Sequence, residues 1–465
     1  MADFKDLRIS VIGAGMGGLG TALAFAKKGF RHITVYESAS NLGFVGAGIQ
    51  LAPNLARVLD RWGCWEGIKA EATNILSSSI REGSTNRELA HVLMPDIAEK
   101  YGYPHSTGHR ASLAGGLYEA CLRESDRITF RFSTTLTGID SWGSGDGSGS
   151  GSGSGPARFT VQPRGGEPEQ VETDVLLGAD GIKSVARRAL LRALDISAEV
   201  EDTGQAAYRI MLKRAEMEGD PEMLALLDAD CALRWIGEKR HIVAYPISNK
   251  TIYNLSTCQP DVNFAAAPGA TYTTRGSKSE MLRVYADFCP LVQRMLNLVP
   301  EGEVCEWKLR SHRPLESWTL GAVALVGDAC HPTLPHLAQG ATMAIEDGAT
   351  LAECVSRAPP GGLALARALK VYELLRKDRT TAMVDLAAFS GRALHLGEGK
   401  AKEERDRQFA LAREKGAPIP DKWASPEVQD MLYSYDCVKE AGEKFDELFA
   451  GLEKQQSQQS NGVHA

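Results

Sequence analysis

The opening of the chain constrains its fold more than any other stretch. A β-rich apolar run, Ile9 to Ile12, leads into a glycine turn and then into an Ala/Leu-rich helical pattern. Gly13 permits the tight turn, Gly15 lets the backbone approach a pyrophosphate, and Gly18 allows close packing of helix on strand. The helix would then point its free N–H groups at the phosphates. This order of strand, turn and helix predicts a dinucleotide-binding unit.

A second strand pattern, Ile33 to Glu37, completes this unit. Glu37 lies about 24 residues after Gly13, close to the ~20 expected for the acid that accepts from a ribose hydroxyl. The unit predicts a dinucleotide, and by itself it does not distinguish NAD from FAD.

Composition excludes several classes of protein. The net charge of −7 argues against non-specific binding to nucleic acid or to an anionic membrane. No apolar run approaches the ~18 residues that a membrane span needs, and no basic-apolar leader begins the chain. The nine cysteines are scattered without a C-x-x-C pair, so we expect reduced thiols in a cytoplasmic protein and neither disulfides nor a metal site.

Two later segments suggest further approaches to a ligand. Glycines at 46 and 48 indicate backbone that passes close to a bound molecule, or a flexible loop between strand and helix. Arg110 is expected at a helix start, where the dipole does not favour a cation. Either a surface ion pair or a cofactor phosphate would account for it.

The middle of the chain is rich in strand patterns. We expect strands within 75–91, a meander over 128–142 and 157–177, and a separate antiparallel sheet from 206–213, 233–235, 242–247 and 253–257. The Gly/Ser-rich stretch 143–155 has a flexible-linker composition, natural or engineered, and is expected to connect two hairpin strands. Helices are expected over 278–298, 363–413 and 426–453, the last with Ser425 as N-cap, and the tail 455–465 is expected to be disordered.

Two more glycine motifs follow strands. Gly178-Ala-Asp180-Gly181 comes between a strand and a helix start. Gly327-Asp328-Ala-Cys-His-Pro332 ends a buried strand, and a helix begins near Gly340. Asp328 is placed to hold a ribitol hydroxyl or to act as an ordinary cap, and the helix near Gly340 offers N–H donors to an anion.

These three motifs together resemble those of the single-component FAD-dependent aromatic hydroxylases, the para-hydroxybenzoate hydroxylase family. The stretch HPTLPHLAQGATMAIEDG, residues 331–348, is most similar to the salicylate-hydroxylase-like branch, which includes fungal phenolic-polyketide monooxygenases. The resemblance covers about residues 7 to 395. It implies an α/β fold: a doubly wound, Rossmann-like FAD-binding domain, an inserted mixed β-sheet substrate domain and a helical C-terminal portion.

The resemblance also implies domain boundaries. They place FAD-binding parts at 1–74, 108–195 and 311–360, substrate-domain strands at 75–107, the main substrate domain at 196–310, C-terminal helices at 361–453 and a disordered tail at 454–465.

Cofactor roles carry over from the family onto matching positions. Glu37 would bind the adenosine ribose, Gly48 would lie near the flavin, and Arg110 would contact the pyrophosphate. Asp328 would contact the ribitol, and Ala341, which follows Gly340, would lie at the helix start under the isoalloxazine. Asp180 would serve both FAD and the nicotinamide of NADH or NADPH.

Substrate roles are implied by two strand motifs. Ala207-Tyr208-Arg209 and Ala244-Tyr245-Pro246 resemble paired motifs of the phenolic-polyketide branch, in which Arg and Tyr hold the substrate phenolate. Arg is a fixed cation and Tyr a directed donor, so the chemistry is reasonable. A surface ion pair for Arg209 and a core aromatic role for Tyr245 remain alternatives. His241 and His331 are candidate bases because histidine titrates near neutrality, although either could be purely structural.

The implied reaction is hydroxylation of a phenol by O2 through a flavin C4a-hydroperoxide, with NAD(P)H as reductant. Attack at a carbon bearing carboxylate would be decarboxylative, and attack at one bearing methyl would be dearomatising. Two alternatives are an FAD-dependent epoxidase of an isoprenoid alkene, which would not need Arg209, and an inactive flavin-binding scaffold. The sequence predicts neither the phenol nor the oligomeric state.

Overall fold

A six-stranded sheet forms the core of the first half of the molecule. The computed structural model describes residues 4–43, 46–143, 155–197, 200–261 and 273–462. The strand order is β19-β20-β12-β1-β2-β8, parallel except for β19. The strands are β1 Arg8–Ile12, β2 His32–Tyr36, β8 Ile128–Arg131, β12 Val175–Gly178, β19 Thr319–Leu320 and β20 Val323–Leu325.

Helices cover this sheet because its strands are apolar on both faces. All four residues of β12 are buried, as are four of the five in β1. Parallel strands of this kind require cover on both faces. The covering helices include α1 Met16–Lys27, α5 Arg110–Leu122, α6 Val185–Ala193 and α11 Gly340–Arg357. The predicted doubly wound α/β architecture is therefore confirmed.

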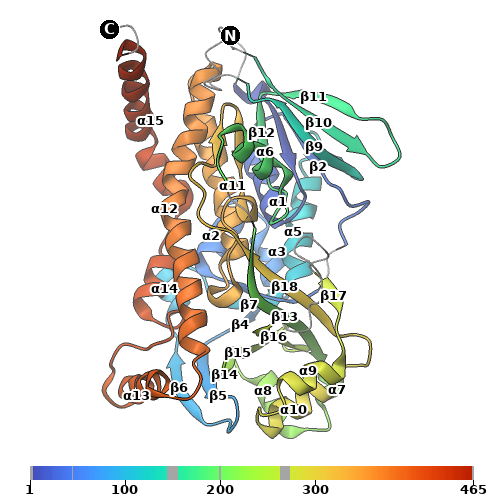
Figure 1. The fold of residues 1–465 in the computed structure, drawn as a ribbon, viewed down its shortest axis with the longest axis vertical. Coiled ribbons are helices and arrows are strands. Elements are labelled where there is room, and N and C mark those ends of the chain that lie inside the picture. The colour runs from blue at the N-terminus through green and yellow to red at the C-terminus, as the bar shows by residue number, and fades with distance from the viewer. Residues whose placement is uncertain (1–3, 44–45, 144–154, 198–199, 262–272, 463–465) are drawn as a thin grey trace.

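The second half of the molecule is built on an eight-stranded mixed sheet, in the lower part of Figure 1. Its order is β17-β18-β13-β16-β15-β14-β5-β6, antiparallel except for the β14–β5 pair. The strands are β5 Ser77–Glu82, β6 Glu88–Leu93, β13 Glu201–Lys213, β14 Cys231–Gly237, β15 Arg240–Ile247, β16 Ile252–Pro260, β17 Thr273–Arg275 and β18 Cys305–Ser311.

The two faces of this sheet have different environments because side chains alternate along each strand. On β13, Tyr208, Ile210 and Leu212 belong to an apolar core shared with four short helices. These helices are α7 Arg214–Met217, α8 Pro221–Asp228, α9 Lys278–Val284 and α10 Pro290–Asn297. The opposite face carries Ala207 and Arg209 and is turned toward the first domain.

Two smaller sheets and several short helices complete the fold. One three-stranded sheet consists of β3 Gly48–Leu51, β7 Ser106–His109 and β4 Thr73–Asn74, and another of β9 Thr134–Ser141, β10 Ala157–Pro163 and β11 Glu169–Thr173. The remaining short helices are η1 Phe4–Asp6, α2 Pro53–Arg61, α3 Trp65–Lys69, α4 Ile97–Tyr101, η2 Gly327–Ala329 and η3 Pro335–Leu337.

The expected meander is shorter than predicted. Only β9 to β11 form it, because 128–131 and 175–178 pair with the parallel sheet instead. Strands β9 and β10 are antiparallel neighbours, which confirms that 143–155 connects two hairpin strands. Residues 144–154 themselves lie outside the described residues.

The C-terminal portion is helical, and α12, Gly362–Leu394, runs the length of the molecule from the first domain toward the second sheet (Figure 1). It is followed by α13 Lys400–Lys415, α14 Pro426–Tyr433 and α15 Cys437–Gly462. Ser425 caps α14 through its hydroxyl, as predicted. In the described part of the chain, no helix combines the length and apolarity that crossing a bilayer demands.

Three C-terminal predictions were wrong. The single helix expected over 363–413 is divided into α12 and α13, because residues 395–399 are not helical. The single helix expected over 426–453 is divided, because Arg57 donates to the carbonyl oxygens of Tyr433 and Tyr435 at 3.0 and 2.7 Å and ends α14 there. Asp436 then starts α15 by accepting from Lys439 N at 3.0 Å. The tail is helical to residue 462 because glutamine is a good helix former, and Arg367 holds the side chain of Gln456 at 2.8 Å.

Candidate active site

A cavity of about 490 Å³ lies between the two halves of the molecule. One wall consists of the glycine turn before α1, the 326–328 loop and the start of α11. The other wall is the inner face of the eight-stranded sheet, with residues from β13, β14, β15, β16 and β18. A group bound against the first domain would therefore face the residues of the second.

The three predicted glycines of the first turn differ in what requires them. Gly13 has a φ of +97°, and a Cβ there would lie 2.5 Å from the carbonyl oxygen of Ala179. A Cβ on Gly18 would lie 1.9 Å from the carbonyl oxygen of Gly13. Gly15 has no neighbouring atom within 4 Å of such a position and lines the cavity. Two of the glycines are thus required by packing, and the third keeps space open for a ligand.

The start of α1 is arranged to receive an anion. Its N-cap residue, Gly15, provides no side-chain hydrogen bond to the first N–H groups. The N-cap of α11, Gln339, provides none either, and Gly340 and Ala341 of α11 line the same cavity. Two helix N-termini therefore direct partial positive charge and donors toward one space.

Glu37 and Asp180 both bond to backbone near this turn. Glu37 follows β2 and accepts from Ala14 N and Ala39 N, each at 2.7 Å. Asp180 accepts from Val185 N at 2.7 Å in the first turn of α6, whose N-cap is Ser184, and neither carboxylate lines the cavity. Their predicted contacts with ribose and nicotinamide stay predictions, and Asp180 also has a structural use.

Asp328 and Arg110 both line the cavity. The Asp328 side chain is open to the cavity but enclosed by its walls, and this desolvation raises the pKa of its carboxyl. The same effect lowers the pKa of the Arg110 guanidinium, which Asp328 opposes. Arg110 is the first residue of α5, and His109 accepts from Ala111 N at 3.1 Å to cap that helix.

These residues fit an FAD molecule. The two uncapped helix starts and Arg110 suit a pyrophosphate, the carboxylate of Asp328 suits a hydroxyl, and Gly15 leaves the space that a phosphate would fill. These residues are far apart in the sequence, and the fold brings them to one wall.

The sheet wall carries the predicted substrate residues. Arg209 on β13 and Tyr245 on β15 both line the cavity, on strands separated only by β16. Arg209 lies over the ring of Trp307, 4.2 Å from its centroid, and among the described residues no carboxylate pairs with it. Burial and the charge of Arg110 lower the pKa of Arg209 to about 10. Burial raises the pKa of Tyr245, which the charge of Arg209 opposes.

Gly48 lets the first domain approach this wall. Its N–H donates to Asn254 Oδ1 at 2.7 Å, and a Cβ there would lie 2.7 Å from Cε2 of Tyr245. The missing side chain of Gly48 therefore leaves room for Tyr245 at this point, a contact that sequence motifs did not predict.

The two predicted histidine bases have different surroundings. His241 lies on β15, two residues from Val243 and four from Tyr245, and shares their cavity-lining face. His331 does not line this cavity. Its Nε2 lies 2.5 Å from Oδ2 of Asp347, and the ring borders a separate space of about 20 Å³. The structure therefore brings His241 together with Arg209 and Tyr245, and it does not bring His331 there.

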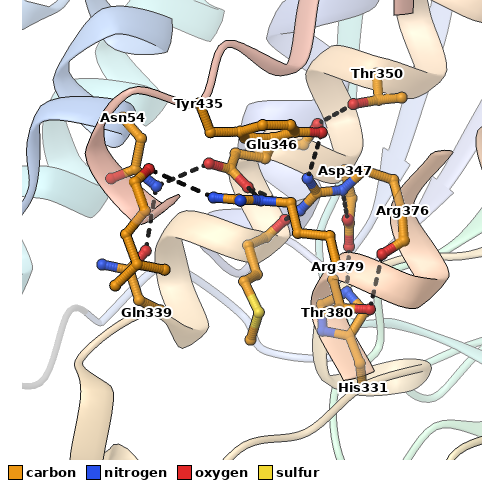
Figure 2. Close-up of polar contacts among 12 residues, drawn as sticks. Asn54, His331, Gln339, Glu346, Asp347, Thr350, Arg376, Arg379, Thr380 and Tyr435 are labelled. Atoms are coloured by element: carbon orange, nitrogen blue, oxygen red, sulfur yellow. Dashed lines mark hydrogen bonds and ion pairs between the residues drawn. The ribbon is translucent and has the colours of Figure 1, made fainter. Parts of the chain in front are cut away.

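A cluster of buried charges lies around His331 on the first domain's side (Figure 2). Asp347 accepts from Gly327 N at 3.0 Å and from Arg376 Nε at 2.8 Å. Arg376 also pairs with Glu346 at 2.9 Å, and Asn54 donates to Glu346 at 2.8 Å. We call Glu346, Asp347 and Arg376 the anchor cluster, because it ties the 327–331 loop and α11 to α12.

Sequence reasoning missed several cavity residues. Trp307, Arg234 and His336 line the cavity, and Arg234 pairs with Asp421 at 2.9 Å. Alternation along β15 could have placed His241 and Tyr245 on one face. No local pattern marks Trp307, Arg234 or His336, because their roles depend on which strands become neighbours.

Comparison with known proteins agrees with this geometry. A family model described as an FAD-binding domain matches residues 6–387. The chain belongs to this FAD-binding family. The enzyme is 30% identical to the FAD-dependent monooxygenase ntnJ of a Nectria species, with 96% of this chain and 98% of that protein covered. It is also 30% identical to 3-hydroxybenzoate 6-hydroxylase 1 of Aquipseudomonas alcaligenes, over 86% and 92% of the two chains.

Solved structures share the fold. CtdE in complex with FAD and a substrate superposes with a TM-score of 0.78 at 19% identity, covering 96% of this chain and 100% of that one. The predicted resemblance is confirmed: this chain is a flavin monooxygenase that uses FAD. Its nine cysteines are all free, and all but Cys305 are buried.

Proposed function

We propose that this flavin monooxygenase hydroxylates a phenolic aromatic ring that Arg209 and Tyr245 hold as a phenolate. The observation that carries the proposal is the position of both side chains in one cavity, opposite Gly15, Asp328 and Ala341. The relative named 3-hydroxybenzoate 6-hydroxylase 1 supports an aromatic substrate.

Charge supports the phenolate form. Arg209 is largely desolvated, and no carboxylate among the described residues neutralises it. A buried cation without an ion-pair partner is costly, and an anionic substrate would offset that cost. The guanidinium carbon lies 4.2 Å from the centroid of the Trp307 ring, and this cation–π contact helps to hold the side chain in place. Phenolate is also more nucleophilic toward an electrophilic oxygen than neutral phenol.

The residues of the first domain would bind and orient the cofactor. FAD, once reduced by NADH or NADPH, would supply the electrons that activate O2, and one atom of that O2 would be transferred to the ring. Arg110 and the starts of α1 and α11 would hold its phosphates, and Asp328 would fix a ribitol hydroxyl. Gly48 lets Tyr245 lie close to this wall, so the substrate and the cofactor would meet within one cavity.

His241 is the group that we propose as base. Its ring lines the cavity, and burial together with its neighbours lowers its pKa well below the usual range, so it is neutral and able to accept a proton. His331 has its Nε2 engaged by Asp347, and we do not assign it this role. The free, mostly buried cysteines support a cytosolic location.

The test is a screen of phenols with the holoenzyme. Hydroxybenzoates, resorcinols and acylated phenols are added with NADH or NADPH, and oxidation of the nicotinamide is followed with ¹⁸O2 as the gas. We expect at least one phenol to accelerate oxidation and to yield a product that carries one ¹⁸O. Acceleration only by isoprenoid alkenes, or by no added compound, would overturn the proposal.

A further inference from the structure

Three histidines from separate parts of the chain meet at the end of the cavity beside β15. His241 comes from β15, His336 from η3 and His395 from the C-terminal end of α12. Their ring centroids lie 4.9 to 5.7 Å apart. His241 and His336 line the cavity, whereas His395 does not and is partly exposed. The cluster therefore extends from the cavity toward the protein surface.

Only one pair within this cluster is hydrogen-bonded. Nδ1 of His241 lies 2.6 Å from Nε2 of His395. Both ring nitrogens of His336 are buried without a partner, so this ring takes no proton from the pair. The backbone fixes His395 in place, because Lys239 N donates to its carbonyl oxygen at 2.9 Å. The pair thus has one inner ring against the cavity and one outer ring.

We propose that His241 and His395 form a two-imidazole path along which the proton of the substrate hydroxyl leaves the cavity. This inference rests on the proposed function. The substrate O–H bond breaks as a proton passes to Nε2 of His241, and Nδ1 of His241 gives its proton to Nε2 of His395. His395 releases its other ring proton to water, so both rings end neutral in the opposite tautomer and the phenolate keeps the electron pair.

The surroundings favour transfer and not storage of the proton. Burial, with a smaller contribution from the charge of Arg234, lowers the pKa of His395 to about 4. Burial, with smaller contributions from His395 and Arg234, lowers the pKa of His336 to about 3. A path of neutral rings passes a proton on because neither ring holds it at neutral pH. The other ionisable groups near the rings are Cys258 on β16, Glu238 and Lys239 in the β14–β15 turn, and Arg405, which donates to the carbonyl oxygens of residues 393 and 394.

The path gives the buried ring of His241 a route for releasing a proton. His241 is 4% exposed, so bulk water does not reach it freely. A phenol that ionises against Arg209 must release its proton before oxygen transfer. In this scheme His241 touches the substrate, and His395 acts through His241 as a positioning and relay residue.

The test follows ionisation of 4-nitrophenol by the oxidised holoenzyme below the pKa of the free phenol. Stopped-flow absorbance reports phenolate, and an indicator dye in weak buffer reports the released proton. We expect His395→Gln and His395→Ala to slow proton release by about tenfold or more, since general acid–base transfer contributes 10²–10⁴-fold. FAD content and the final amount of bound phenolate should stay unchanged. The control His91→Gln changes an exposed histidine of β6 and should release the proton at the wild-type rate.

Two readouts separate relay from structure. Added imidazole should restore the rate of His395→Ala, and a proton inventory of the wild-type enzyme in mixed H2O and D2O should be curved, because more than one proton moves along the path. Wild-type rates in both variants, a slow variant that imidazole does not rescue, or a linear inventory would overturn the path. If the wild-type enzyme neither ionises 4-nitrophenol nor hydroxylates any phenol, the proposed function itself fails. If it does so and the variants match it, only the path fails.

Discussion

The anchor cluster and the sheet wall of the cavity both bury polar side chains, and they differ in how these are partnered. In the anchor cluster, both oxygens of Asp347 accept hydrogen bonds and Arg376 contacts two carboxylates (Figure 2). On the sheet wall, Arg209 has an aromatic ring but no carboxylate among the described residues. His336 of η3 lines the same cavity, and neither of its ring nitrogens has a hydrogen-bond partner among those residues.

The difference separates structural from functional burial. Buried charges that are paired and hydrogen-bonded hold a fold together, and removing one partner leaves the other unpaired. Polar groups that stay unpartnered in a cavity lower stability unless a ligand completes them. The anchor cluster should therefore respond to mutation through stability, and the sheet wall through turnover.

The largest effect is expected from Asp347→Ala. The change removes one of the two carboxylates that neutralise the buried charge of Arg376, and it removes the acceptor of Gly327 N. We therefore expect the unfolding free energy to fall by ~3–5 kcal/mol. FAD affinity should also fall, because the 327–331 loop loses its tie. Thermal unfolding and flavin release measure both. Glu280→Gln, in an exposed pair with Arg283, is the control, and an equal effect of the two changes would remove the distinction.

Arg209→Ala should produce the opposite pattern. Loss of a charged hydrogen bond to the substrate should cost ~1.5–3 kcal/mol in transition-state stabilisation, about tenfold to more than hundredfold in kcat/KM. FAD content and unfolding temperature should stay near those of the wild type. Arg209→Lys should recover part of the rate, because a point charge replaces a planar fork.

Tyr245→Phe sharpens this result. If both side chains act on one phenolate oxygen, the double variant should lose less than the sum of the single variants. The exposed Arg283→Ala serves as control. Full activity in Arg209→Ala would remove that residue from the site.

The two regions should also titrate in different pH windows. Burial lowers the pKa of His336 to about 3, so below pH 6.5 the unfolded chain binds a proton that the folded chain does not. The free energy of unfolding is therefore unaffected by this histidine above pH 6.5. It falls as the pH is lowered, by about 2 kcal/mol at pH 5. Asp347 has a lowered pKa, because His331 and Arg376 outweigh the effect of burial. The stability that its carboxylate contributes to the fold is therefore lost only as the pH falls below 3.8.

Unfolding temperature measured from pH 7 to pH 3 tests these windows. His336→Gln should reduce the slope of the curve between pH 6.5 and 4, and the remaining slope comes from His241 and His395, whose pKa values are also lowered. Asp347→Asn should reduce the slope only below that range. A wild-type curve without any slope between pH 6.5 and 4 would contradict the first assignment.

The smallest effect is expected far from both regions. Replacing 143–155 by a tight turn between β9 and β10 changes loop-closure entropy by only ~0.6 kcal/mol per halving of length. Turnover and unfolding temperature should both stay near the wild-type values. A large loss of turnover with the fold intact would show that this segment affects the cavity.

The sequence alone determined the first domain and its ligand. Gly13 adopts a positive φ and Gly18 packs against Gly13 itself, so both are required within one short strand, turn and helix unit, and the motif was sufficient to name them. Arg209, Tyr245 and His241 were also selected from sequence, and strand alternation accounts for their common face.

Only the tertiary structure decided which of these groups are partnered. His331 lies three residues after Asp328 in a flavin motif, yet its ring turns to Asp347 on α11, a contact that depends on helix packing. His241 meets His395 because α12 extends to the second sheet, and the two residues are 154 positions apart. Local patterns specify strands, turns and helices, because their interactions are short-range. Whether a buried polar group is satisfied depends on distant segments that meet only in the folded chain.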